Sequence, residues 1–281
     1  MPGDATKVVV LMLPLYEKYK KAMSTLLFRE IVFGPVHSRR LGISLGMNLL
    51  PVDGKVCSFD CIYCECGYNS ERHAHSGLPS REEVSECLKN RLIAMHGRGE
   101  KLDVITFAGN GEPTLHPDFA AIIDDTLRLR DTYYPEAKVS VLSNATRIDR
   151  ADVFAALNKV DNNILKLDSS LDKTVRLINS PASPSFTVEK LIDALCRFNG
   201  NLIVQTLFLQ GRHNGTTVDN TTEEELRPWL DAVRRIAPKE VMIYTIDRET
   251  PEKELRKAPP ATLDAIARRV EALGIKAQVS Y

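Results

Sequence analysis

The sequence has few cysteines, no excess of either charge and no long apolar run. Six cysteines in 281 residues are too few for a disulfide-stapled scaffold, and no segment has the pattern of a secretory signal. The 37 basic and 37 acidic residues balance, so the chain offers no overall field that would attract nucleic acid. No apolar run approaches the roughly 18–20 residues needed to span a bilayer. We therefore expect a cytoplasmic protein without a membrane anchor.

The composition is otherwise that of an ordinary globular chain, with 43% hydrophobic residues. Residues 1–30 hold a short apolar run and a charged stretch outside the pattern that follows, and we expect an N-terminal extension there. No linker rich in glycine, serine or proline interrupts residues 31–281. The sequence therefore predicts one domain over residues 31–281.

Short apolar segments alternate with helical patterns along this domain. Strands are expected over residues 43–49, 104–108, 138–143, 163–168, 202–209 and 240–246, with a short final strand over 275–280. Between them lie helical patterns, of which the first has Ser80 as its N-cap and an acidic first turn. About six β/α units of this kind predict an α/β fold with a parallel sheet.

Three cysteines lie within eight residues, in the pattern C-x3-C-x2-C formed by Cys57, Cys61 and Cys64. Thiolates are soft ligands and normally hold iron–sulfur clusters, and three of them would leave one iron of a cubane open. A structural zinc site is the alternative, with Cys66 or a histidine of the following loop as fourth ligand. A redox C-x2-C motif would leave Cys57 without a role.

The cysteine motif, with Tyr63 before its last cysteine, resembles the signature of the radical S-adenosylmethionine (SAM) superfamily. The segments from Phe33 to Pro51 and from Cys57 to Gly67 are similar to the branch of wyosine-synthase-like Fe–S oxidoreductases. The resemblance implies a partial (β/α)6 TIM-like barrel, a 4Fe–4S cluster held by the three cysteines, and SAM as cofactor. It also implies a 5′-deoxyadenosyl radical that abstracts hydrogen from substrate, and an external one-electron reductant of the flavodoxin or ferredoxin type.

Polar residues follow the predicted strands at their carboxyl ends, where the functional groups of such barrels gather. The resemblance assigns SAM binding to this edge, where the Glu112 carboxylate would take the ammonium group. The family has a Gly-Gly-Glu-like segment and this chain has Asn-Gly-Glu, so the glutamate matches and the first glycine does not. Turn formation is the alternative for these segments. The cofactor-binding candidates are Tyr63, Asn110, Gly111, Glu112, Ser143, Asn144, Lys166, Gln205 and Tyr244.

The fourth predicted strand carries two charged residues on one face. Alternation sends Lys166 and Asp168 to the barrel interior and Leu165 and Leu167 towards the helices. Interior charges are costly unless they are paired. The pair is therefore the catalytic candidate, with the lysine as base, hydrogen-bond donor or Schiff-base amine. A structural ion pair without a catalytic role is the alternative.

The sequence bears on the substrate through its remaining cysteines and its charge. Wyosine-synthase relatives modify transfer RNA and need a second cluster, but Cys66, Cys87 and Cys196 share no spacing that would build one. A small-molecule or peptide substrate is expected instead, and a glycyl-radical-activating role or a non-catalytic zinc or iron–sulfur module are alternatives. The basic residues His37, Arg39 and Arg40 form either an anion-binding lip of the site or a surface turn.

Overall fold

The computed structural model describes residues 26–38 and 41–281. Eight strands form one sheet in the order β1-β2-β3-β4-β5-β6-β9-β11, in which every neighbouring pair is parallel except β1 with β2. The strands are β1 (Val32–Ser38), β2 (Gly42–Met47), β3 (Val104–Phe107), β4 (Lys138–Ser143), β5 (Asn162–Lys166), β6 (Ile203–Leu207), β9 (Glu240–Tyr244) and β11 (Lys276–Ser280). The order and direction confirm the predicted partial (β/α) barrel.

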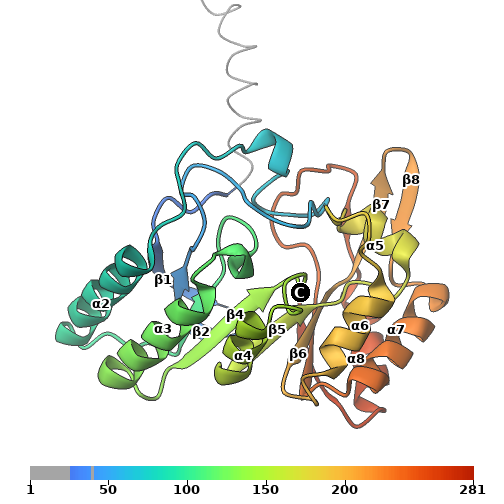
Figure 1. The fold of residues 1–281 in the computed structure, drawn as a ribbon. Helices are drawn as coiled ribbons and strands as arrows, with labels where there is room; N and C mark the ends of the chain where they lie inside the picture. Colours follow the sequence, from blue (N-terminus) through green and yellow to red (C-terminus); the bar gives the residue numbers. More distant parts are fainter. Residues whose placement is uncertain (1–25, 39–40) are drawn as a thin grey trace, which may run out of the picture.

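The helices lie on the outer face of the curled sheet (Figure 1). They are α2 (Arg81–Gly97), α3 (Phe119–Tyr133), α4 (Ala151–Lys159), α5 (Asp172–Ile178), α6 (Val188–Cys196), α7 (Glu223–Ile236) and α8 (Pro260–Glu271). The predicted cap of α2 is confirmed, because the Ser80 side chain accepts from the Glu83 amide and the Glu83 carboxylate accepts from the Ser80 amide. Between helices and sheet lies the main apolar core, in which Trp229 packs edge-on against Phe208.

Three elements of the structure differ from the sequence-based expectation. Strand β1 forms where a lip or turn was expected, although it contains Gly34 and Pro35. It tolerates them because it is the edge strand and its pairing with β2 is irregular between Phe33 and Val36. Helix α5 was not predicted. The segment expected as one strand over residues 202–209 divides at Phe208, whose amide bonds to Tyr244 instead.

Beyond that division the chain enters a second, three-stranded sheet in the order β10-β7-β8. It consists of β10 (Arg256–Lys257), β7 (Leu209–His213) and β8 (Thr216–Asp219), and its hairpin projects beyond α5 and α6 (Figure 1). No helix among the described residues is long and apolar enough to cross a membrane.

Part of the predicted extension contacts the barrel. The Phe28 backbone donates to and accepts from the side-chain amide of Asn110, each at 2.8 Å. Residues 1–25 lie outside the described residues, as do Arg39 and Arg40, so the boundary at residue 30 and the anion-binding lip stay predictions.

Candidate functional site

The cysteine loop lies between β2 and α2 and is bridged to the segment that follows β3. The Val56 amide donates to the Asn110 carbonyl at 2.9 Å, and the Glu112 amide donates to the Val56 carbonyl at 3.1 Å. Between them Gly111 has φ +136°, and a Cβ there would lie 1.9 Å from the Val56 oxygen. A glycine is therefore required where the two segments approach.

Each of the three motif cysteines has a polar partner. The Asn144 side-chain amide donates to Cys57 Sγ at 3.6 Å, and the Asn179 amide donates to Cys61 Sγ at 3.3 Å. Burial raises the pKa of Cys57 and raises that of Cys61 to about 11. By contrast, a hydrogen bond with Cys66 and the charge of Lys55 lower the pKa of Cys64. Hydrogen bonds and a nearby cation both favour sulfur in its thiolate form.

A buried lysine closes the loop. Lys55 is 4% exposed, and its ammonium donates to the Gly67 carbonyl at 2.6 Å and to Asp60 Oδ1 at 3.1 Å. The same Asp60 oxygen accepts from the Asn69 amide at 2.9 Å. These contacts hold together the two ends of the loop that carries the cysteines.

This donor set fits an iron–sulfur cluster better than a single ion. A zinc ion needs four ligands directed at one point. Over residues 26–38 and 41–281, no group of three or more His, Cys, Asp or Glu side chains is arranged to hold one ion. A cubane instead takes each thiolate on a different iron, so its ligands need not converge, and amide donors to its sulfurs tune its potential.

Glu112 is the most completely satisfied acid of the site. It is 2% exposed. Its Oε1 accepts from the Thr114 hydroxyl at 2.6 Å and from the Ser143 hydroxyl at 2.8 Å, and its Oε2 accepts from the Asn144 amide at 2.7 Å. Burial raises the pKa of Glu112, although these hydrogen bonds oppose the rise. A ligand cation beside this carboxylate would favour the charged form.

Lys166 and Asp168 face the barrel interior, as alternation predicts. The ammonium of Lys166 lies 3.7 Å from Asp168 Oδ2 and donates to the Tyr244 hydroxyl at 3.1 Å. It also lies 5.2 Å from the centre of the Tyr63 ring, whose hydroxyl donates to Asp168. Burial by itself would lower the pKa of Lys166, but the Asp168 carboxylate raises it above its ordinary value. Lys166 is therefore a protonated hydrogen-bond donor.

The structure brings most of the predicted site residues together, with two exceptions. The Asn110 side chain points to the backbone of Phe28 and Pro51 and is occupied there. Gln205 lines a separate cavity deeper in the barrel. Among the remaining cysteines, Cys87 is exposed on α2.

Sequence reasoning missed two residues that position the site. Asn179 follows α5 and donates to Cys61, Tyr63 and Asp168, the last at 2.7 Å. Lys55 is the other. An asparagine before a Ser-Pro pair predicts only a turn, and a lysine near cysteines predicts a solvated charge, so neither residue carried a signal.

Comparison with known proteins identifies the family. The model of the radical SAM superfamily matches residues 52–224, which is more than half of the chain. A protein named GTPase Obg from Brachyspira hyodysenteriae is 30% identical over 250 residues, 86% of this chain and 34% of that protein. The chain thus spans about a third of that relative. A UPF0026 protein of Methanocaldococcus jannaschii is 31% identical over 82% of this chain and 67% of its own length.

A solved structure agrees with the fold. The crystal structure of a radical SAM methyltransferase from Sphaerobacter thermophilus superimposes with a TM-score of 0.64, covering 99% of this chain and 84% of that one. At 13% sequence identity this likeness shows the fold alone. The wyosine-synthase-like branch stays a prediction. The match over the cysteine loop and the barrel confirms the superfamily: the chain belongs to the radical SAM superfamily, whose members use a 4Fe–4S cluster and SAM.

Proposed function

We propose that this chain cleaves SAM reductively and uses the 5′-deoxyadenosyl radical to abstract a hydrogen atom from a substrate. Cys57, Cys61 and Cys64 would hold the cluster. When bound, the cluster would supply the electron for reductive cleavage of SAM to methionine and the 5′-deoxyadenosyl radical. An external reductant of the flavodoxin or ferredoxin type would replace the electron.

The residues beside the cysteines suit the polar ends of SAM. Glu112 offers a buried carboxylate for the ammonium group. Ser143 and Asn144, which already bond to Glu112, would also contact the polar end of SAM. The backbone of Gly111 could approach SAM closely because glycine has no Cβ. Lys166, held between Tyr63 and Tyr244, would donate a hydrogen bond to cofactor or substrate, and Asp168 would keep it charged.

The single observation that carries this proposal is the position of Asn144. Its backbone amide bonds to Glu112 at 2.7 Å, while its side-chain amide bonds to Cys57 Sγ at 3.6 Å. One residue thus joins Glu112, the carboxylate predicted to take the ammonium group of SAM, to the cluster loop. A purely structural metal module would have no use for an acid held in this way.

The substrate we propose is a small molecule or a peptide. The chain is electrically neutral, so it offers no general attraction for transfer RNA. The other described cysteines do not favour a second cluster either. Cys66 lies against Gly109, Cys87 lies on α2, and Cys196 lies against Arg235 on the far helices.

The test is anaerobic reconstitution with iron and sulfide, followed by dithionite and SAM and a measurement of 5′-deoxyadenosine. We expect product from the wild-type chain and loss to the background rate in Cys61→Ala, because a cluster with two thiolate ligands would not be retained. Cys196→Ala removes a thiol outside the site and is the matched control. A colourless chain that retains zinc and forms no deoxyadenosine would contradict the proposal.

A further inference from the structure

The ammonium of Lys55 is bonded to the cysteine loop at two places. It donates to the carboxylate of Asp60, the residue before Cys61, at 3.1 Å, and to the Gly67 carbonyl at 2.6 Å. The Gly67 amide in turn donates to the Cys64 carbonyl at 2.9 Å. One positive charge is thereby fixed inside the loop that carries the three thiols.

This charge acts on two of the thiols proposed to hold the cluster. A hydrogen bond with Cys66 lowers the pKa of Cys64 most, and the charge of Lys55 and a hydrogen bond from it lower that pKa further. Burial raises the pKa of Cys57, and the charge of Lys55 opposes this rise. Both effects have one cause, because a cation favours the negatively charged form of a neighbouring sulfur. Lys55 is thus close enough to these ligands to stabilise negative charge on them.

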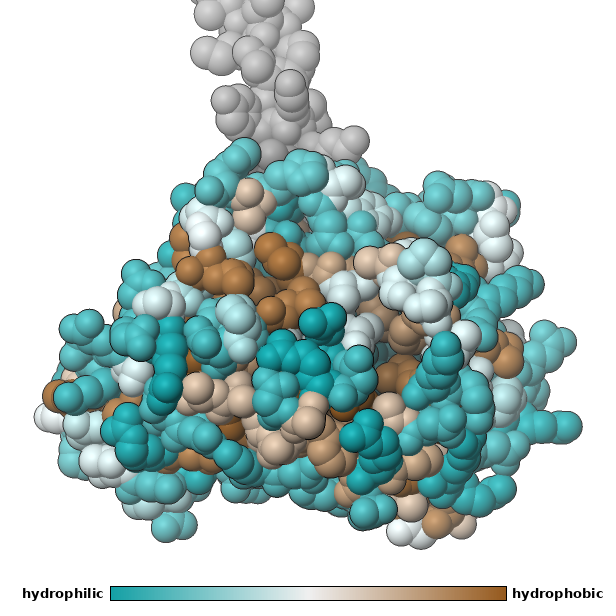
Figure 2. Space-filling model, in the orientation of Figure 1, coloured by the Kyte–Doolittle hydropathy of each residue, from teal (hydrophilic) through white to brown (hydrophobic). Residues whose placement is uncertain are grey.

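The acidic partner of Lys55 does not cancel its charge. The Lys55 side chain is 1% exposed, whereas that of Asp60 is 29% exposed. On the face shown in Figure 2, hydrophilic side chains cover most of the surface, and water and salt screen the charges of such groups. A buried charge is screened much less. The ammonium therefore acts on the cysteines more strongly than the carboxylate does, and the pair leaves a net positive field there.

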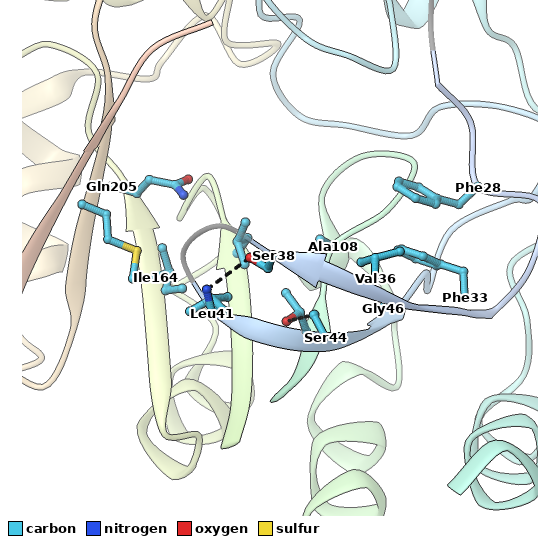
Figure 3. A pocket seen from close by; sticks show the side chains of 13 residues that line it. Phe28, Phe33, Val36, Ser38, Leu41, Ser44, Gly46, Ala108, Ile164 and Gln205 are labelled. Carbon is cyan, nitrogen blue, oxygen red and sulfur yellow. Dashed lines mark hydrogen bonds between the residues drawn. The ribbon is translucent and has the colours of Figure 1, made fainter. Parts of the chain in front are cut away.

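Lys55 is not part of the cavity inside the barrel. That cavity has about 170 Å³ and lies beneath the β1–β2 hairpin. Figure 3 shows Gln205 and Ile164 on one side of it and Phe28 on the other. Neither Lys55 nor Asp60 is among the described residues that line it. A ligand in the cavity would therefore not be bound by this ammonium, whose contacts described above lie within the cysteine loop.

We propose that Lys55 raises the reduction potential of the cluster and thereby favours electron transfer from the external reductant. This inference rests on the proposed function for the presence of the cluster. One electron leaves the reductant and enters the cluster, which gains one negative charge. A buried cation beside the thiolates stabilises the reduced form more than the oxidised form, because net charge and hydrogen bonds at the sulfurs set the potential. Lys55 is a positioning residue in this sense, since it acts through the cluster and not on the substrate.

The test is an anaerobic redox titration of the reconstituted full chain without SAM, monitored by the electron paramagnetic resonance signal of the reduced cluster. Lys55→Gln removes the charge and keeps an N–H donor for the Gly67 carbonyl. We expect its equilibrium constant for reduction to fall about tenfold, which for one electron is a potential about 59 mV more negative. Asp60→Asn removes the anion and keeps the acceptor oxygen. Its potential should shift in the opposite direction, and by less, because Asp60 is more exposed.

Lys159→Gln is the matched control. Lys159 pairs with Asp124 at 2.6 Å, but both of these side chains are about half exposed, so the potential should equal that of the wild type. An unchanged potential in Lys55→Gln, or shifts of one sign in Lys55→Gln and Asp60→Asn, would overturn the inference. A folded Lys55→Gln chain that keeps no cluster would overturn it too, because Lys55 would then hold the loop rather than tune the cluster.

Two further outcomes separate this inference from the proposed function. If Lys55→Gln does not fold, Asp60→Asn decides by itself, and a potential no higher than that of the wild type overturns the role of Lys55. The readout is a potential rather than deoxyadenosine. A chain whose potentials shift as expected but which cleaves no SAM would contradict the proposed function alone. Deoxyadenosine formation with equal potentials in all variants would contradict the role of Lys55 alone.

Discussion

At the scale of single residues, the site is built from side chains that bond to one another before any ligand is bound. Glu112 accepts from Thr114, Ser143 and Asn144, and Asp168 accepts from Asn179 and from the Leu207 amide. Groups locked in this way keep their geometry without the cofactor, which lowers the cost of binding it.

Glu112 has a further consequence for stability. Because burial raises its pKa above the ordinary 4.5, the folded chain holds this proton more tightly than the unfolded chain. Its contribution to stability is therefore complete below pH 4.5 and is lost as the pH rises through the folded pKa. In the absence of SAM, we expect the free energy of unfolding of the wild type to fall relative to that of Glu112→Gln as the pH rises from about 4 to 7. Urea denaturation across this range measures it.

Glu83 provides a control of opposite sign. Hydrogen bonds from Ser80 lower its pKa, so its contribution is present above the unfolded pKa and is lost as the pH falls. The difference between wild type and Glu83→Gln should therefore grow in favour of the wild type as the pH rises. If both variants gave the same trend, the raised pKa of Glu112 would be refuted.

At the scale of elements, one buried asparagine attaches the outer hairpin to the barrel. Asn220 follows β8, accepts from the Leu209 amide at 2.9 Å and donates to the Leu207 and Asp168 carbonyls at 2.7 and 2.9 Å. It thereby joins the start of β7, the end of β6 and the residue that holds Lys166. The hairpin is thus coupled to the candidate catalytic pair.

Asn220→Ala should lower the free energy of unfolding by about 2–4 kcal/mol, because three buried backbone groups would lose their partner. The Leu209 amide should also exchange its hydrogen faster. Asn90→Ala, at an exposed position of α2, is the matched control and should change stability by less than about 0.5 kcal/mol. Equal effects of the two substitutions in denaturation and hydrogen exchange would show that Asn220 is not the attachment point.

At the scale of the whole molecule, the cluster loop contributes little regular structure of its own between β2 and α2. Ligands that bind only the folded chain add to its stability, by about 2.7 kcal/mol at a hundred times Kd. We therefore expect reconstitution to raise the melting temperature by about 5–10 °C, given about 2–4 °C per kcal/mol in domains somewhat smaller than this one. Calorimetry of chains with and without iron and sulfide measures this.

Cys61→Ala treated in the same way is the reference for non-specific iron, and it should show no rise. Cys196→Ala should behave as the wild type, because its thiol lies on α6 against the Arg235 carbonyl. An unchanged melting temperature in the wild type would mean that the cysteine loop does not hold a cluster.

Much of this arrangement follows from local patterns in the chain. The three thiols lie within eight residues, so they are close in any fold, and the alternation of apolar residues in β5 sends Lys166 and Asp168 to one face. Strand periodicity and caps such as Ser80 give the order of the β/α units, because these signals depend on neighbours only a few positions away.

Other features depend on residues far apart in the chain. Asn179 reaches Cys61 across 118 positions, and the edge strand β1 forms despite Gly34 and Pro35 because β2 is beside it. Gln205 reads from sequence as an inward polar residue of β6, and only the surrounding strands place it at the wall of a cavity. Spacing thus predicts the cluster ligands, whereas long-range packing decides which residues surround them.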